Sequence, residues 1–504
     1  MKEKQSMKKT GSSKKDNVIS VIIVITFSII IIISASYAKS GEVSNYLTII
    51  IEDMGIPTTA FVPTIEYYFS NDGSESNDGL SPDNPLKDPT PFFNTSGASL
   101  FLKSGDVFYL DEAYLTNSNI MISSYGDTEK AIISGLKTSS NTFSKVSDEI
   151  YSVILNDSEI GALIEGGNLN WSRVSRHDYL CNSGDYYFDA GTRTLYKKSI
   201  ENIEGTTVQY SLGKNAIKLS GASQVIIQNI EICNYGRHGV NIGSSCSNIT
   251  VDNCYIHNIG GAELSTNVKY GNAIQVWSDN CHSITISNNT VKNIYDTGIT
   301  AQNSKNSGAV GNSTNIIIKN NNVSNCYWGM EFYNNQQSCF AECYVEYNTV
   351  TDIRDITNGY RWDKAGVVGE HGGANALRFV GVNPNDRYYI SNNIFANSED
   401  AALFIVHDIS GGIAQFSNNT FSANSPLLLA DPSYYDGESD TFNSLEANEY
   451  YVDANGSTII TDESVAKTNK LHTFDYSGVL VCTVFLLVIT FFILIINTIK
   501  KFHK

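Results

Sequence analysis

The sequence predicts an all-β solenoid, and three observations support this prediction. A short strand pattern, apolar residues followed by an Asn-rich turn, recurs seven times between residues 225 and 421, and its last apolar residues lie 24 to 45 positions apart. Apolar and polar residues alternate with a period of two within each copy, which excludes helical repeats. Proline does not occur from residue 92 to 383, as expected where every strand must donate its backbone N–H groups to the next coil.

The repeats consist of two strands each. The first-strand copies are VIIQNIEI (225–232), ITVDNCYI (249–256), ITISNNTV (284–291), IIIKNNNV (316–323), YVEYNTV (344–350), YYISNNIF (388–395) and AQFSNNTF (414–421). Six of them are followed by a second alternating strand, at GVNI (239), AIQV (273), GITA (298), GMEF (329), ALRF (376) and ALFI (402). Coils of this size bury their apolar face only by stacking on their neighbours. Asn suits the stacked turns, because it tolerates left-handed conformations and can hydrogen-bond to the Asn one coil above.

The charge is unevenly placed along the 504 residues. The net charge is −18, but residues 1–16 carry +4 and residues 500–504 carry +3, which leaves −25 for the remainder. No nucleic-acid partner is expected, because contact with phosphates requires clustered Lys and Arg. A hydrophobic fraction of 41% at this length also excludes a fully disordered chain.

Two uncharged apolar runs adjoin the basic ends, and each is long enough to cross a bilayer as a helix. Basic flanks mark the cytoplasmic side, so the chain between the two transmembrane helices is expected on the extracellular side of the cell membrane. The first run is alternatively a cleaved signal peptide, because Ser36 and Ala38 match the small-residue positions of a cleavage site.

The chain therefore divides into seven predicted segments. They are a basic cytoplasmic tail (1–17), a transmembrane helix or signal peptide (18–38), a linker (39–65), a solenoid ectodomain (66–440), a C-terminal stalk (441–476), a transmembrane helix (477–499) and a second basic cytoplasmic tail (500–504).

Two of the nine cysteines are predicted neighbours. Cys246 and Cys281 precede Ile249 and Ile284 by the same offset, so they stack on adjacent coils as a disulfide or as a ladder of thiols. Because no Cys-x-x-Cys pair occurs, a structural zinc site is not expected.

Several segments have the form of a known superfamily. They are YYFSNDGSESNDGLSPDNPLKD (67–88), SGDVFYL (104–110), ISSYGDTEKAIISG (122–135), GDYYFDAGTRTLYKKS (184–199) and the stretch from GNAIQVW to WGMEFYN (271–334). Over residues 66–430 the chain resembles the pectate-lyase-like superfamily, which implies a right-handed parallel β-helix. That superfamily includes lyases, hydrolases, epimerases, esterases and non-catalytic adhesins, so the resemblance selects no reaction. The chain shows no polygalacturonase-like acidic cluster, no epimerase-like DPHD and no pectin-esterase-like signature, so no catalytic residue is carried over.

The second-strand copies predict a groove on the surface of the solenoid. The inward residues form an apolar stack of Val240, Ile274, Ile299, Met330, Leu377 and Leu403. The outward residues include Asn241, Gln275, Trp277, Gln302, Glu331, Tyr333 and Arg378, and His238 precedes the first of these strands. Amide, charged and aromatic side chains repeating at the strand spacing of about 4.8 Å suit a polysaccharide. The alternative is a solvated sheet face.

Two further features supply candidate catalytic residues. Asp296 lies at the corner entering the strand that carries Gln302, one coil before Glu331, and paired carboxylates can hydrolyse a glycosidic bond. The alternative for Asp296 is a turn cap. The longest loop between coils, residues 351–374, adds charged residues or is a solvated insertion.

A β-elimination lyase needs a base at the sugar C5 and a group that neutralises the uronate carboxylate. The candidates for the base are Lys364, Arg361 and His371, and the candidate Ca²⁺ ligands are Asp296 with Glu331 or Asp363.

Together, these features predict a membrane-anchored extracellular protein that acts on a polysaccharide as a lyase or a hydrolase. One alternative is a non-catalytic glycan-binding adhesin or an accessory protein of exopolysaccharide assembly. A further alternative is a C5-epimerase, which would change sugar composition without shortening the chains.

Overall fold

The computed structural model describes most of the predicted solenoid. The described residues are 63–127, 129–265, 268–269, 271–277, 280–303, 312–334, 338–360, 373–381, 383–405, 413–422, 427–429 and 458–460. The two predicted transmembrane segments, 18–38 and 477–499, lie outside these residues. In the described part, no helix has the length and apolar character needed to cross a membrane.

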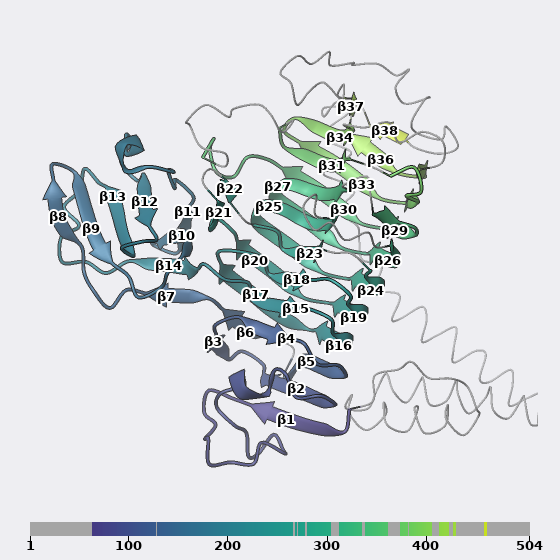
Figure 1. The fold of residues 1–504 in the computed structure, drawn as a ribbon, viewed down its shortest axis with the longest axis horizontal. Helices are drawn as coiled ribbons and strands as arrows, with labels where there is room; N and C mark the ends of the chain where they lie inside the picture. Colours follow the sequence, from purple (N-terminus) through teal and green to yellow (C-terminus); the bar gives the residue numbers. More distant parts are fainter. Residues whose placement is uncertain are drawn as a thin grey trace, which may run out of the picture.

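The chain winds into a parallel β-helix with three faces (Figure 1). Face one consists of β1 (Ile65–Phe69), β2 (Ala98–Lys103), β5 (Ile120–Tyr125), β16 (Ser223–Gln228), β19 (Ser247–Asp252), β24 (His282–Ser287), β26 (Asn312–Lys319), β29 (Cys343–Glu346), β32 (Tyr388–Ser391) and β35 (Ala414–Ser417). Face two consists of β3 (Val107–Tyr109), β6 (Ala131–Ser134), β17 (Ile230–Tyr235), β20 (Tyr255–Ile259), the first parts of β25 (Thr290–Gln302) and β27 (Asn322–Tyr333), β30 (Thr349–Ile353), β33 (Ile394–Ser398), β36 (Thr420–Ser422) and β38 (Thr458–Ile460).

Face three carries the predicted groove. Its strands are β4 (Ala113–Leu115), β15 (Ile217–Leu219), β18 (Val240–Ile242), β23 (Ile274–Trp277), the second parts of β25 and β27, β31 (Asn375–Val380), β34 (Ala401–Ile405) and β37 (Leu427–Leu429). Smaller elements are the 3-10 helix η1 (Thr90–Phe92), the hairpin of β21 (Glu263–Ser265) and β22 (Val268–Lys269), and β28 (Cys339–Phe340). Strand β38 falls in the segment predicted as a stalk and pairs in parallel with β36.

An insertion leaves the stack after its first coils and forms the lobe on the left of Figure 1. It contains β7 (Leu136–Thr138), β8 (Ser144–Ser147), β9 (Ile150–Ile154), β10 (Ile160–Glu165), β11 (Asn168–Asn170), η2 (His177–Tyr179), β12 (Tyr186–Asp189), β13 (Thr194–Lys198) and β14 (Gln209–Leu212). Four of its strands form an antiparallel sheet in the order β12-β13-β9-β8. The insertion has a hydrophobic cluster of its own, which includes Val153, Tyr186 and Leu195.

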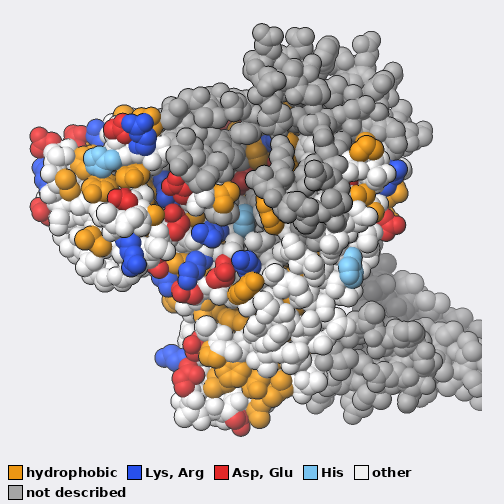
Figure 2. All heavy atoms as spheres, in the orientation of Figure 1, with side chains coloured by type: hydrophobic (Ala, Val, Ile, Leu, Met, Phe, Trp, Pro, Cys, Tyr) orange, Lys and Arg blue, Asp and Glu red, His pale blue; other side chains and the backbone are white. Residues whose placement is uncertain are grey.

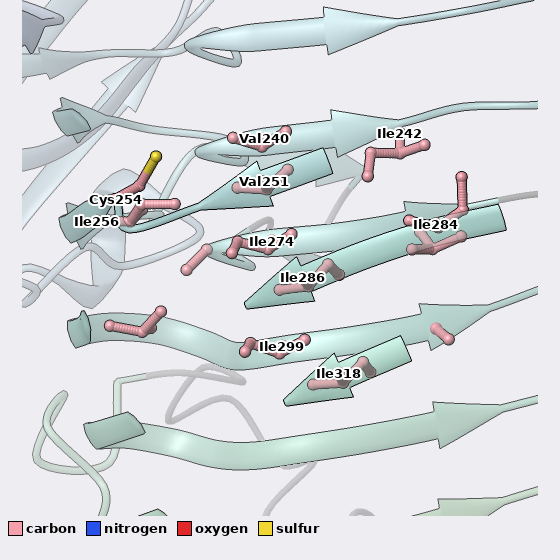
Figure 3. Close-up of a cluster of buried hydrophobic side chains, with 14 of the residues drawn as sticks. Val240, Ile242, Val251, Cys254, Ile256, Ile274, Ile284, Ile286, Ile299 and Ile318 are labelled. Carbon is pink, nitrogen blue, oxygen red and sulfur yellow. The ribbon is translucent and has the colours of Figure 1, made fainter. Parts of the chain in front are cut away.

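The core is a set of vertical stacks of apolar side chains. Figure 3 shows Val240, Ile274 and Ile299 from face three together with Val251, Ile286 and Ile318 from face one. The inward residues predicted for face three are all buried, and consecutive members pair in register up to Leu403. The predicted apolar stack is therefore confirmed.

Asn residues hold the turn between faces one and two, as predicted. A buried ladder of Asn289, Asn321, Asn348, Asn393 and Asn419 runs up this turn. The Oδ1 of Asn321 accepts the backbone N–H and the side-chain amide of Asn289, both at 3.0 Å. The same pattern repeats one coil up, where Asn348 accepts both groups of Asn321. The residue before each ladder member has a positive φ, for example 56° at Asn320. This makes a tight turn, which directs the side chain of the following Asn into the interior of the β-helix.

None of the cysteines in the described part of the chain forms a disulfide. Cys246 and Cys281 are buried on adjacent coils in the main hydrophobic cluster. Of the two alternatives that the sequence left open, the structure therefore has the ladder of thiols.

We predict that Asn321→Ala lowers the stability of the β-helix by about 3 kcal/mol, because a buried backbone N–H and two buried amides lose partners. The matched control is Asn322→Ala, since the Asn322 side chain is exposed and should change stability by less than about 0.5 kcal/mol. Thermal unfolding followed by circular dichroism measures both. Equal melting temperatures of the two variants would contradict a stabilising role of the ladder.

Candidate functional site

Face three presents its outward side chains in the predicted register. Asn241 pairs with Gln275, and Gln275 pairs with Thr300. The line continues from Thr300 to Glu331 and from Glu331 to Arg378. Two positions along the strands, Trp277 pairs with Gln302 and Gln302 with Tyr333. The outward residues of face three, from Asn241 on β18 to Arg378 on β31, thus lie in line on one face, as the sequence predicted.

A groove of about 470 Å³ lies over the lower part of this surface. Six predicted residues line it, namely Asn241, Gln275, Trp277, Gln302, His238 and Asp296. Further lining residues, which were not predicted to bind substrate, are Lys218, Arg237, Lys269 and Asn272. Figure 2 shows Lys and Arg side chains gathered together with Asp and Glu between the insertion and the stack.

The charge of the groove is opposite to that of the protein. Lys218, Arg237 and Lys269 contribute three cations, and Asp296 is the carboxylate among the described lining residues. The chain as a whole carries −18. A local excess of positive charge in an acidic protein is a feature of a site that attracts anions.

The insertion fixes one of these cations. Lys269 is buried, and its Nζ donates to the backbone oxygens of Arg173 at 2.8 Å and of Tyr360 at 3.2 Å. Arg173 is itself buried and forms ion pairs with Glu159 at 2.6 Å and with Glu263 at 3.4 Å. The insertion, the β21–β22 hairpin and the turn after β30 are thereby joined beside the groove, and the hairpin residues Leu264 and Lys269 line it.

His238 enters the groove as a neutral imidazole. Its Nδ1 accepts the backbone N–H of Asn272 at 3.2 Å. Burial, with the nearby positive charge of Arg237 as a second cause, lowers the pKa of His238 to about 3. With Nδ1 serving as an acceptor, the proton of the neutral ring is assigned to Nε2, which makes this nitrogen a hydrogen-bond donor.

Asp296 lies where β25 passes from face two to face three, which is the corner predicted for it. Strand β25 is continuous through residues 290–302, with an irregularity in register between Ile294 and Thr297. The backbone N–H of Asp296 donates to Gly271 O at 3.2 Å, and Thr297 Oγ1 donates to its Oδ1 at 3.4 Å. The irregularity turns the half-buried carboxylate toward the groove, whose lining includes it.

Glu331 and Arg378 form a buried pair beside the groove. Arg378 Nε lies 3.3 Å from Glu331 Oε1, and their side chains are only 2% and 6% exposed. Gln302 Nε2 donates to Glu331 Oε2 at 2.5 Å, so Gln302 connects the pair to the groove. The Arg378 guanidinium also lies 3.6 Å from the centre of the Trp328 ring.

This pairing changes the role expected for Glu331. A carboxylate neutralised by a guanidinium and closed off from solvent is not placed as the second acid or base of a hydrolase. Tyr333 likewise lies outside the described groove lining and packs with Val380, Ala401 and Phe404.

Asn272 is a groove residue that the sequence analysis missed. Its Nδ2 donates to Gln275 Oε1 at 2.5 Å, and its Oδ1 accepts the backbone N–H of Thr297 at 3.1 Å. Asn272 therefore orients the side-chain amide of Gln275 and the backbone of Thr297, the residue next to Asp296. Its position directly before the second-strand copy at residue 273 was the available signal, because turn residues there face the groove.

The remaining predicted catalytic residues, Arg361, Lys364 and His371, lie outside the described residues, as does Asp363. The described groove residues can be compared with the ligands that calcium requires. Ca²⁺ takes about six to eight oxygen ligands, mostly carboxylates and carbonyls. The described lining instead offers the carboxylate of Asp296 among three cations, and Glu331 is paired with Arg378. These residues do not fit a calcium site.

Part of the chain matches a known family model. The family model described as a right-handed β-helix region matches residues 194–379. One similar solved structure is XylC in complex with xylose, at 12% identity and a TM-score of 0.42, where the match covers 72% of this chain and 70% of that chain. A second is pectate lyase Pel9A, at 11% identity and a TM-score of 0.41, where the match covers 80% of each chain. A third is the GH136 lacto-N-biosidase from Eubacterium ramulus, at 14% identity and a TM-score of 0.42. The match covers 79% of this chain but only 61% of the lacto-N-biosidase, which is less than two thirds. No curated protein matches the chain in sequence. The predicted right-handed parallel β-helix is confirmed by the parallel strand stacking and, over residues 194–379, by the family model.

We predict that protonation of His238 destabilises the protein at low pH. Its folded-state pKa of about 3 lies below the ordinary value of 6.5, so the unfolded chain takes up the proton first. The stabilising contribution is complete above pH 6.5 and is lost between 6.5 and about 3, by at most about 1.4 kcal/mol per pH unit.

The comparison variant is His238→Asn, whose side-chain oxygen can still accept from the Asn272 N–H but does not titrate. Urea unfolding of both proteins at pH 7, 5 and 4 measures the difference. Parallel pH profiles for the two proteins would show that His238 is not buried in the neutral form.

Proposed function

We propose that the protein is a polysaccharide lyase that cleaves an anionic, uronate-containing glycan in the groove of face three. The observation that carries this proposal is that Lys218, Arg237 and Lys269 line the same groove as Asp296. A uronate carboxylate has the charge that this lining attracts, and a carboxylate base beside cations is the arrangement that β-elimination requires.

The roles follow from the chemistry of the lining. The cations neutralise the sugar carboxylate and stabilise the negative charge that develops when the C5 proton leaves. Asp296 takes that proton, the C4–O bond breaks as the C4–C5 double bond forms, and the departing oxygen takes a proton from solvent. The products are an unsaturated sugar end and a shortened chain.

The neutral groups of the groove position the glycan. Trp277 is 38% exposed, which leaves its ring accessible for stacking on a sugar face. Asn241, Gln275 and Gln302 provide amides at successive rungs, and His238 provides an N–H donor. Hydrogen bonds and a flat apolar face are what recognition of a sugar needs.

The second candidate function is glycan binding without catalysis, as in an adhesin or an accessory protein of exopolysaccharide assembly. One observation favours it. Among the described residues of the groove, Asp296 has no second solvent-facing carboxylate beside it, because Glu331 is paired with Arg378. This arrangement disfavours two-carboxylate hydrolysis and leaves elimination or binding. A C5-epimerase would share the first proton transfer and then return a proton to C5.

The location of the protein is part of the same proposal. The apolar segments 18–38 and 477–499 would anchor the chain in the cell membrane and place the β-helix on the extracellular side. Protease treatment of intact cells tests this placement, since an external β-helix is accessible to the protease and a cytoplasmic one is protected.

We predict that full-length protein releases products absorbing in the ultraviolet from a panel of uronate polysaccharides, and that Asp296→Asn lowers the rate at least 100-fold. Trp277→Ala should weaken substrate binding by about tenfold through loss of stacking. Tyr347→Ala, which removes a 59% exposed aromatic at the turn between faces one and two, outside the groove lining, should have no effect.

Several outcomes separate the alternatives. Binding that depends on Trp277 without any product would identify a non-catalytic glycan-binding protein. Changed sugar composition without shorter chains would identify an epimerase, and new reducing ends without ultraviolet absorbance would identify a hydrolase. Full turnover by Asp296→Asn would overturn its assignment as the base.

A further inference from the structure

Face two carries a cluster of potential metal ligands that the groove does not use. Glu231 and Cys233 point outward from β17, and Cys233 pairs directly with His257 on β20. One ligand atom of each residue lies within 4.8 Å of the others. His257 Nε2 and Glu231 Oε1 are 3.0 Å apart. A thiol, an imidazole and a carboxylate from two adjacent coils therefore lie close together.

We propose that Glu231, Cys233 and His257 bind a zinc ion. Thiolate sulfur, imidazole nitrogen and carboxylate oxygen are the ligand types that Zn²⁺ accepts, at about 2.0 to 2.3 Å each. In a tetrahedral site such ligands lie roughly 3.5 Å apart, so the observed separations need to change by only about 1 Å. The sulfur and nitrogen donors favour zinc over calcium or magnesium.

The residues around the cluster hold its ligands in place. Asn234 Nδ2 donates to Cys233 Sγ at 3.3 Å, as expected for a group that stabilises a thiolate. Asn234 is held in turn by Asn258, whose Nδ2 donates to its Oδ1 at 3.3 Å. On the other side, the Tyr255 ring stacks on the His257 ring at 4.3 Å. The ligands are thus supported by rigid strands and by a second layer of contacts.

Two of the three ligands reach the surface, and Cys233 is buried beneath them at 4% exposed. The side chains of Glu231 and His257 are 23% and 15% exposed. Glu231 and Tyr255 also line a cavity of about 560 Å³ beside the cluster, together with Lys130 and Asn253. Three protein ligands with an open side leave a fourth position for water or another ligand, which distinguishes this site from a closed four-ligand structural site.

This cluster is not visible as a motif, because its ligands are not close together along the chain. Glu231 and Cys233 are separated by one residue, but His257 follows 24 residues after Cys233. Only the stacking of β17 on β20 brings it opposite Cys233. The absence of a Cys-x-x-Cys pair therefore does not exclude zinc in a β-helix.

The test uses full-length protein treated with chelator and then titrated with Co²⁺ and with Zn²⁺. We expect about one Co²⁺ per chain, with the near-ultraviolet absorption of a cobalt–thiolate bond, and displacement of Co²⁺ by Zn²⁺ but not by Ca²⁺. Cys233→Ser should abolish the thiolate band, and His257→Gln and Glu231→Gln should each weaken binding at least about tenfold.

The matched controls are Cys181→Ser and His282→Gln, which remove an exposed cysteine and an exposed histidine outside the cluster and should bind the metal like the unaltered protein. The melting temperature of each variant in chelator shows whether it still folds. The proposal is overturned if folded protein shows no cobalt–thiolate band, or if Glu231→Gln and His257→Gln bind Co²⁺ as tightly as the controls. Neither result depends on lyase activity, so this inference and the proposed function can fail separately.

Discussion

Hydrogen bonding between successive rungs is the constraint on which the rest of the structure depends. Each rung satisfies its backbone N–H and C=O groups on the rung above and below, at a spacing of about 4.8 Å. A slip of one residue would turn every apolar side chain outward, so the register is strongly specified. Side chains at equal positions must then stack, which produces the apolar core, the buried Asn ladder at residue 321 and the polar line from Asn241 to Arg378.

The same constraint explains how much could be predicted. Because a β-helix repeats one local pattern, matching the copies of that pattern was enough to align Asn241 with Gln275 and Glu331 with Arg378. The alignment says which residues are neighbours but not how deeply they are buried. The sequence therefore predicted Glu331 and Arg378 together, and the structure adds that they neutralise each other away from solvent.

Features outside the repeat were not predictable in the same way. The groove lining depends on Lys269 donating to the backbone of Arg173 and Tyr360, three residues from an insertion, a hairpin and a turn that share no pattern. Asp296 was expected at a corner, but the sequence did not show that β25 continues unbroken through this corner. Cys233 and His257 each directly follow a first-strand copy, so the repeat aligns them, but the alignment alone does not show that they form a cluster with Glu231.

The central claim is that an acidic protein uses a cationic groove to recognise an anionic glycan. Cations concentrated at Lys218, Arg237 and Lys269 can attract a negative polymer that the surrounding surface repels. Calorimetry of full-length protein with an oligouronide, and with the same oligosaccharide after reduction of its carboxyl groups, tests this claim most directly. The account predicts that the oligouronide binds at least about tenfold more tightly, with an advantage that falls as salt is added. Equal affinity for the two sugars would contradict it.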